Sequence, residues 1–310
     1  MKQSGMLPKM GTLLIGVVLF VALHARANDT SFGDENGSIV LTKQPEISME
    51  QERLFISKDL VEVNYVFRNT GEQDLNVPVA FPMPPMHFDY SDHSEIKDFK
   101  IWIDDQPIKP SRRLVVRLFT GQDVSLEVAK LGWRERDLYR LMNRAAEPPK
   151  GKKRLPKSWF DKDGEPMFTL SEYFTWSQRF PAGQQLRVRH TYAPSVETGV
   201  PQPVEYIVSE YGPKTCLDKA GRAGMLRRDR EGGVSWGFLR YVLTTANNWS
   251  GPIKDFTLTI RKEDSAEVIS LCLDGPIKKK DPLTFEFHAD NFKPERDIAI
   301  LFVKGWRPEP

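Results

Sequence analysis

Apolar and polar residues alternate in several short segments of the chain, and this period-2 pattern predicts β-strands with one buried face. Residues 61–67 and 75–81 are the clearest examples. The Asn-Thr-Gly sequence at 69–71 suits a turn between them, because Asn and Gly tolerate positive φ. We therefore expect residues 54–82 to form an antiparallel hairpin. The apolar face of its first strand carries Val61, Val63, Tyr65 and Phe67.

Further apolar runs predict short strands along most of the remaining chain. Gly, Pro, Asn and Asp residues separate these runs at regular intervals, which is typical of β-sandwich architecture. The predicted strands cover residues 99–103, 173–180, 186–192, 206–208, 238–245, 256–260, 268–273, 283–287 and 298–303.

Two segments depart from the strand pattern. Between residues 133 and 146 apolar side chains recur at helical spacing, which predicts an amphipathic helix. Three prolines within residues 147–157 then predict a loop. We expect a second, short helix after Cys216, within residues 216–230, although two glycines there lower the helix propensity.

These elements together predict a mostly-β protein with two β-sandwich-like units, a helical insertion around residues 122–150 and a short helix after Cys216. The chain is long enough for two ordinary domains. The expected organisation is a signal peptide (1–27), an N-terminal β-sandwich-like unit (28–110), a helical and loop insertion (111–165) and a C-terminal β-rich unit (166–310).

The first 27 residues have the layout of a secretory signal peptide. Lys2 and Lys9 precede an apolar run at 13–23, and Ala25-Arg26-Ala27 then places small residues before a cleavage site. The apolar run is shorter than the roughly 20 residues that a membrane-spanning helix needs. We expect cleavage between Ala27 and Asn28, and a periplasmic or secreted protein. A retained N-terminal anchor is the alternative.

The signal-like segment also changes the charge balance of the chain. Three of the 44 Lys and Arg residues lie in the first 27 positions and none of the 42 Asp and Glu residues do, so the remainder has a formal net charge of −1. This near-neutral balance provides no basic field of the kind that attracts nucleic acid. We therefore expect no nucleic-acid partner.

The chain has two cysteines, Cys216 and Cys272. In an oxidising compartment, a single pair of cysteines usually forms one disulfide bond. Two separate buried thiols are the alternative, because a free cysteine packs well as a small apolar residue. Zinc binding by the pair alone is disfavoured, since zinc takes three or four protein ligands.

Several segments of the chain match the pattern of a known bacterial family. They are Asn28-Asp29, residues 41–43, 47–50, 54–57, 65–70, 79–84 and 241–253, and the neighbourhoods of Cys216 and Cys272. Together these segments resemble the bacterial domain-of-unknown-function family 4424. The resemblance implies an exported bacterial protein and covers most of the chain after the signal-like segment, and it is weakest between about residues 110 and 165. Because the family carries no known activity, the resemblance assigns no catalytic residue.

One predicted loop combines imidazole and carboxylate side chains. Histidine nitrogen together with carboxylate oxygen suits zinc or a similar divalent metal. The spacing fits no known metal-binding frame, so an ordinary solvated loop is the competing interpretation. The candidate ligands are His87, Asp89, Asp92, His93 and Glu95.

Two further features are candidates for binding. Trp249 lies in a predicted turn, where its indole either covers the edge of the core or offers a platform on which a ligand stacks. The polar face of the predicted helix carries basic residues that either face solvent or contact an anionic membrane surface or envelope polymer. These residues are Arg136, Arg140 and Arg144.

No segment has the context that catalysis requires. Residues 233–237 fit the G-x-S-x-G pattern around Ser235, but a nucleophile elbow needs a strand before it and a helix after it, and here a predicted strand follows. Phosphate-loop, dinucleotide, H-E-x-x-H and EF-hand patterns are absent, so we expect no cofactor. The sequence favours a non-catalytic envelope protein that binds a ligand or a protein partner. A hydrolase or metal-dependent enzyme acting on cell-envelope material is the alternative.

Overall fold

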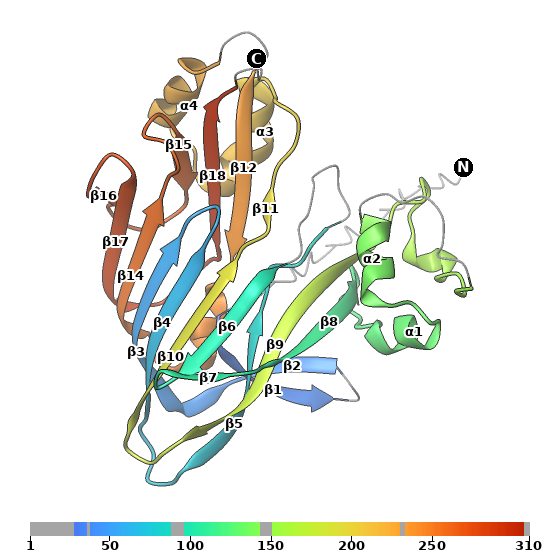
Figure 1. Ribbon diagram of the computed structural model, residues 1–310, viewed down its shortest axis with the longest axis vertical. Coiled ribbons are helices and arrows are strands. Elements are labelled where there is room, and N and C mark those ends of the chain that lie inside the picture. The colour runs from blue at the N-terminus through green and yellow to red at the C-terminus, as the bar shows by residue number, and fades with distance from the viewer. Residues whose placement is uncertain (1–27, 36–37, 88–95, 143–150, 230–232, 307–310) are drawn as a thin grey trace, which may run out of the picture.

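The computed structural model describes residues 28–35, 38–87, 96–142, 151–229 and 233–306, and most of its regular structure is β-strand (Figure 1). This confirms the predicted mostly-β class. Within these residues the strands form three sheets, of nine, five and four strands. The sheets hold a main apolar core of side chains contributed by residues 47–302.

The largest sheet has the order β16-β17-β14-β3-β4-β10-β6-β7, with β13 paired to β3 at one end. Strand β4 shows why these segments are strands, because its side chains alternate strictly between buried and half-buried positions. The strands are β3 (Gln44–Ile56), β4 (Val61–Asn69), β6 (Lys97–Ile103), β7 (Gln106–Ile108), β10 (Gln185–Ala193), β13 (Trp249–Ser250), β14 (Ile253–Arg261), β16 (Lys278–Lys279) and β17 (Thr284–Phe292).

Two smaller sheets complete the β-structure. The five-stranded sheet has the order β2-β1-β5-β9-β8, and the four-stranded sheet has the order β11-β12-β18-β15. Their strands are β1 (Thr30–Glu35), β2 (Ser38–Thr42), β5 (Leu75–Pro82), β8 (Ser111–Leu118), β9 (Phe168–Phe180), β11 (Val196–Glu197), β12 (Val234–Tyr241), β15 (Val268–Leu271) and β18 (Ile298–Gly305).

Both strands of the hairpin predicted at 54–82 are present, but they do not pair with each other, so the predicted pairing is wrong. Strand β4 pairs with β3 and β10, whereas β5 lies in the other sheet beside β1 and β9. Residues 57–60 make the actual hairpin turn, between Ile56 and Val61. The predicted buried face is confirmed, because the four apolar side chains of β4 are each at most 1% exposed.

The predicted domain boundaries do not coincide with the sheets. Strand β3 pairs in parallel with β14, and β4 and β5 pair with β10 and β9. Each of these pairs joins a strand from residues 28–110 to a strand from residues 166–310. The two halves of the chain therefore share sheets and one core. The sequence did not predict this, because strand pairing between distant segments leaves no signal in local sequence patterns.

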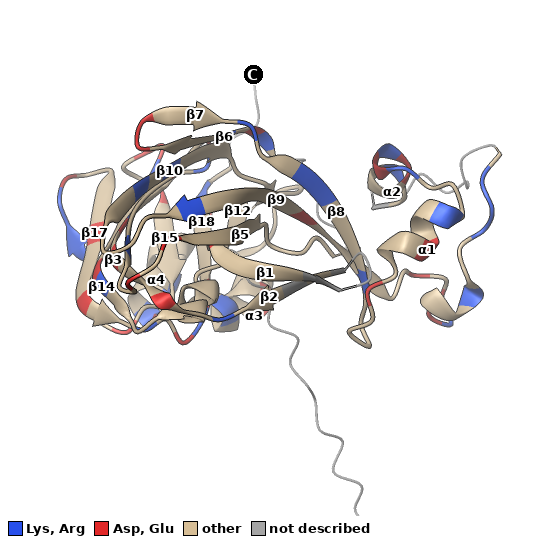
Figure 2. Cartoon of the chain, turned by 90° about the horizontal axis from the view of Figure 1, so that it is seen from below, with Lys and Arg blue, Asp and Glu red and all other residues tan. Residues whose placement is uncertain are grey.

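The predicted helical insertion is present as α1 (Ser125–Lys130) and α2 (Glu135–Met142), with a 3₁₀ turn, η1 (Lys157–Trp159), after them. Figure 2 shows these helices to one side of the sheets, connected through β8. The insertion has an apolar cluster of its own, in which Trp133, Leu138 and Trp159 pack with Phe168 of β9. This cluster fixes the insertion to the end of the five-stranded sheet.

Two more helices lie beside the four-stranded sheet, α3 (Val204–Thr215) and α4 (Lys219–Leu226). Helix α4 confirms the short helix expected after Cys216. The strand predicted at 206–208 is wrong, because this segment lies inside α3. Val204, Ile207 and Tyr211 share one buried helical face, and a window of three residues was too short to show that spacing.

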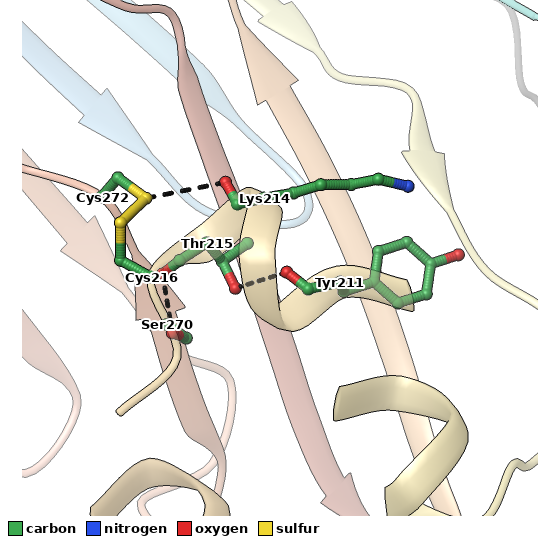
Figure 3. The surroundings of a disulfide bond; sticks show 6 residues. All are labelled: Tyr211, Lys214, Thr215, Cys216, Ser270 and Cys272. Carbon is green, nitrogen blue, oxygen red and sulfur yellow. Dashed lines mark hydrogen bonds between the residues drawn. A yellow bond between two sulfur atoms is a disulfide. The ribbon is translucent and has the colours of Figure 1, made fainter. Parts of the chain in front are cut away.

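The predicted disulfide bond is confirmed. Cys216 follows the last residue of α3 and is bonded to Cys272, with a Cα–Cα distance of 5.0 Å (Figure 3). The adjacent Ser270 hydroxyl donates a hydrogen bond to the Thr215 carbonyl at 2.9 Å. The bond therefore joins the end of α3 to the segment that follows β15.

Among the described residues, no helix has both the length and the apolar character needed to cross a membrane.

Candidate functional site

Polar side chains form a sealed cluster where the start of the described chain meets the large sheet. The imidazole Nε2 of His190 lies 3.0 and 3.1 Å from the two carboxyl oxygens of Asp29. The amide Nδ2 of Asn28 donates a hydrogen bond to Glu52 Oε2 at 3.0 Å. All four residues are at most 1% exposed. The cluster therefore has no direct contact with solvent.

Two tyrosines extend this cluster into the core. The hydroxyls of Tyr65 and Tyr241 lie 3.1 Å apart, and Tyr241 donates to Glu52 Oε1 at 3.5 Å. Glu52 and Tyr65 are cross-strand partners on β3 and β4, and His190 lies on β10, the next strand of the same sheet. Period-2 alternation thus aims these polar groups at an otherwise apolar inner face.

Burial dominates the electrostatics of the cluster. It raises the pKa of Asp29 above its usual value, although the His190 contact acts in the opposite direction. It also raises the pKa of Glu52 to about 8, with the neighbouring Asp29 carboxylate adding to the effect. His190 Nδ1 is buried and has no hydrogen-bond partner among the described residues. Buried groups with shifted pKa values are candidates for acid–base catalysis. However, none of these residues lines either of the two recesses found among the described residues.

A solvent-facing groove lies over the segment that contains Trp249. Its cavity volume is about 380 Å³, which falls in the size range of ordinary ligand sites. We call it the lysine-flanked groove, because Lys43 and Lys293 stand among the residues that line it. Neither lysine forms an ion pair with another described residue. The remaining lining residues are Pro45, Asn247, Asn248, Trp249, Ser250, Gly251 and Pro252.

The floor of the lysine-flanked groove is held in a fixed conformation. It consists of the 3₁₀ turn η2 (Thr244–Asn248) and the start of β13. Asp297 Oδ1 accepts hydrogen bonds from the backbone N–H of Leu243 and Thr244 at 3.0 Å. Asn247 donates to the Pro294 carbonyl at 2.8 Å. A preformed floor lowers the entropy that a ligand would lose on binding.

A second recess is much narrower, with a cavity volume of about 30 Å³. This is enough for about one water molecule. Its charged lining is already paired, because Arg240 donates to Glu197 at 2.7 Å and Arg112 donates to Glu172 at 2.8 Å. The arrangement fits internal bracing between the sheets better than ligand binding.

Three potential metal ligands also meet on the outer face of the large sheet. One ligand atom each from Asp255, His288 and Asp290 lies within 4.8 Å of the others. However, Arg53 holds Asp255 in a close ion pair, with Nη1 2.6 Å from Oδ1, and lowers the pKa of that carboxyl. The guanidinium already supplies the positive charge that a metal would bring. Sequence analysis missed this group because its members come from two separate strands.

The predicted metal loop is only partly covered by the described residues. His87 is half-buried, and its ring centroid lies 6.3 Å from that of Phe119. Asp89, Asp92, His93 and Glu95 lie outside the described residues, so the metal site stays a prediction. The flanking residues Met86 and Ile96 both line the narrow recess.

Trp249 occupies the core position that one of its two interpretations predicts. Its ring centroid lies 5.0 Å from that of Phe67 and 6.1 Å from that of Phe180, and its indole N–H donates to the Asp29 carbonyl. The alternative, a stacking platform for a ligand, requires an exposed ring face, and the residue is only 4% exposed.

The remaining candidates lie on the surface or within a strand. Arg136 and Arg140 are exposed on α2, and Arg144 lies outside the described residues, so contact with an anionic surface stays a prediction. Ser235 lies inside β12, paired with Lys304 of β18, and not at a strand-to-helix turn. The glycine at position 233 is explained by the backbone, since its φ is +97° and a Cβ there would lie 2.5 Å from the Gln202 carbonyl oxygen.

Taken together, the described residues form a β-rich, disulfide-bonded protein with a sealed polar cluster and one open groove of ligand size. The chain belongs to the family described as Domain of unknown function (DUF4424), whose model matches residues 27–301. This confirms the resemblance seen in the sequence. No curated protein matches the chain.

Solved structures offer distant likenesses only. A Legionella pneumophila protein, described as a candidate nutrient binding protein, is 14% identical over 90% of this chain and 70% of its own, with a TM-score of 0.44. An M1 zinc metallopeptidase from Deinococcus radiodurans is 8% identical over 84% of this chain, with a TM-score of 0.31. This chain spans 43% of that enzyme. At these scores we draw no conclusion about function from either likeness.

Proposed function

We propose that this protein is exported and binds an anionic ligand, without catalysing a reaction, in the lysine-flanked groove. One observation carries the proposal. A preformed recess of about 380 Å³ is lined by two lysines that have no carboxylate partners among the described residues. A Lys ammonium is a compact positive charge with three hydrogen-bond donors, which suits carboxylate or phosphate groups.

Export is supported by three observations. The first 27 residues have the layout of a signal peptide, and the family match begins at residue 27. The Cys216–Cys272 bond fits an oxidising compartment, where disulfides form and persist. The absence of catalysis is supported by the state of the titratable groups that gather in the structure, since Asp29, Glu52 and His190 are sealed in the core, and Asp255 and Glu172 are each held by an arginine.

A binding measurement tests the groove. Inorganic phosphate and citrate are titrated against the protein at constant ionic strength while its melting temperature is followed. We expect one of these anions to raise the melting temperature in proportion to the logarithm of its concentration above its Kd. The double variant Lys43→Gln/Lys293→Gln is expected to lose that rise. The matched control Lys130→Gln/Lys219→Gln removes two exposed lysines elsewhere and should keep it.

Two results would overturn this proposal. One is equal stabilisation of the groove variant and the control, which would place anion binding elsewhere. The other is the absence of any stabilisation by either anion, together with no small molecule found by native mass spectrometry in protein isolated from the periplasm of an expressing bacterium.

A metal-dependent activity on envelope material is the second candidate, favoured by the convergence of Asp255, His288 and Asp290. Metal analysis of protein purified without chelator tests it. Stoichiometric zinc or manganese that is lost in His288→Ala would support this candidate, and sub-stoichiometric metal would reject it.

A further inference from the structure

The first three described residues are among the most deeply buried in the molecule. Asn28, Asp29 and Thr30 are at most 1% exposed, although all three are polar. Thr30 begins β1 and accepts a hydrogen bond from the Asn248 side chain at 2.9 Å. Chain ends and their neighbours normally stay at the surface unless they are tied down. This segment is therefore held by specific contacts.

Three of the four polar atoms of Asn28 have identified partners. Its Nδ2 donates to Glu52, its Oδ1 accepts from the Asp29 backbone N–H at 2.9 Å, and its carbonyl accepts from the Thr245 hydroxyl at 2.9 Å. The fourth is the backbone nitrogen, which is joined to Ala27 in the full-length chain. Hydrolysis of the bond between Ala27 and Asn28 changes this atom and leaves the other three as they are.

The cluster around Asn28 holds more potential negative charge than positive charge. Asp29 and Glu52 have no Lys or Arg partner among the described residues, and His190 is the single imidazole in contact with either of them. Isolated carboxylates in a protein interior are strongly unfavourable unless they are paired. One further buried cation would balance the cluster.

The position of Asn28 keeps its backbone nitrogen within about 8 Å of a Glu52 carboxyl oxygen. Nδ2 lies 3.0 Å from Glu52 Oε2, and the backbone nitrogen is four bonds from Nδ2. Standard bond lengths keep the two nitrogens of one asparagine within about 5 Å of each other. The nitrogen also lies on the residue that directly precedes Asp29.

We propose that cleavage before Asn28 creates a buried α-ammonium group that serves as the counter-ion of Glu52 and Asp29. This inference rests on the export and processing proposed above. In the cleavage, water adds a hydroxyl to the Ala27 carbonyl carbon as the C–N bond breaks, and Asn28 leaves as an amine. An ordinary α-amine has a pKa of about 7.7–8.0, and adjacent carboxylates favour its protonated form.

Processing then contributes directly to the stability of the fold. An uncleaved chain has an uncharged amide at Asn28, so at least one of the two buried carboxyl groups must either stay protonated or carry unpaired charge, because His190 can pair with only one of them. The cleaved chain replaces that amide with the missing cation. Because residue 28 is sealed in the folded protein, cleavage must precede the completion of folding, as it does when a protease acts on a chain during export.

A double-mutant cycle tests the pairing. One recombinant chain begins at Asn28, and a second carries Gly-Ser-Ala before Asn28. We expect the first to melt at least about 5 °C higher at pH 7. In the Glu52→Gln background, this difference should fall to less than half, because the α-ammonium has lost one partner. The control Glu205→Gln removes an exposed carboxylate on α3 and should keep the full difference.

A second measurement avoids the steric effect of added residues. Acetylating the α-amine of unfolded protein that begins at Asn28, followed by refolding, removes the charge with a small change in volume. We expect the same loss of melting temperature as with the extension. In the untreated native protein, reductive methylation of the α-amine should be at least 100-fold slower than in urea, as peptide mass spectrometry would show.

The outcomes separate this inference from the proposed export. Equal melting temperatures for the free, extended and acetylated chains, or an α-amine that reacts at its unfolded rate, would overturn the buried ion pair. N-terminal sequencing of protein recovered from the periplasm instead tests processing. A first residue other than Asn28 would reject the cleavage site, while the recombinant chains would still decide whether the pair forms.

Discussion

Glu52 occupies an inward-facing position on β3 between apolar neighbours, and an irregularity in the strand explains why. Ile47 and Met49 are buried at odd-numbered positions, but the register with β4 shifts between Met49 and Gln51. After this shift, the even-numbered positions 52, 54 and 56 point inward. A β-bulge re-aims the following side chains in this way. Alternation continued from Ile47 and Met49 places Glu52 outside, whereas alternation counted back from Leu54 places it inside, so the sequence did not predict the polar cluster.

The raised pKa of Glu52 predicts a specific pH dependence of stability. In a chain whose Asn28 is not the first residue, the Glu52 pKa is about 8 when folded, against an ordinary value of 4.5. The folded state therefore binds more protons between these values, and its stability falls as pH rises through this window. The loss from this residue is up to about 4 kcal/mol. Asn28, Asp29, Tyr65 and Tyr241 are the polar groups that face it.

Urea denaturation of the extended chain at pH 5, 6.5 and 8 measures this effect. Glu52→Gln should flatten the profile relative to the parent, whereas Glu205→Gln should leave it unchanged. Parallel profiles for the parent and Glu52→Gln would show that this carboxyl group titrates normally in the folded state.

At the scale of elements, local pattern identified strands well and their partners poorly. The alternation in β4 was sufficient to predict its buried face, because burial depends on which side chains are apolar. It could not show that β4 pairs with β10 rather than β5, since the turn residues at 69–71 suit a hairpin and a sheet-to-sheet connection equally well. Likewise, the apolar residues at 206–208 fit a strand until the spacing from Val204 to Tyr211 is considered.

The disulfide allows a test of how firmly α3 is attached. Cys216 and Cys272 are separated by 56 positions, and closing a loop of that size in the unfolded chain corresponds to about 4 kcal/mol in the chain-entropy model. Both side chains are partly exposed, so replacing them by serine removes little buried apolar surface. We expect Cys216→Ser/Cys272→Ser to lower the free energy of unfolding by roughly 3–4 kcal/mol.

Chemical denaturation of the double serine variant, beside the parent with and without reductant, measures that change. Reduction should reproduce the loss in the parent and have no effect on the variant. A loss below about 1 kcal/mol would mean that packing alone fixes α3 against β15 and β18.

For the whole molecule, composition and pattern were sufficient to predict the β class, the helical insertion and the disulfide. They did not predict that the two halves of the chain share sheets, because no property of residues 44–56 indicates that their parallel partner is at residues 253–261. The lysine-flanked groove could not be predicted from the sequence either, since Lys43 and Lys293 are 250 positions apart. Trp249, at its floor, was recognised as a residue of interest but not as part of a recess.

The shared sheets predict the behaviour of fragments. Residues 28–165 alone lack β9, β10 and β14, so β3, β4 and β5 each lose one of their strand partners. We expect this fragment to show no cooperative urea transition and to bind a hydrophobic dye, whereas residues 28–306 unfold in a single transition. A sigmoidal transition of the fragment, detected by circular dichroism, would show that the N-terminal half is an independent domain.

The parallel pairing of β3 with β14 also sets the order of events in time. Residues 44–56 leave the ribosome or a membrane pore about 200 residues before their partner does, and until then the middle of the largest sheet has an open edge. Long-range pairings of this kind slow folding, because the chain loses the entropy of closing a large loop before the strand contacts stabilise it. For a chain that crosses a membrane as an extended thread, this delay is useful: the last third must arrive before the first third can become rigid.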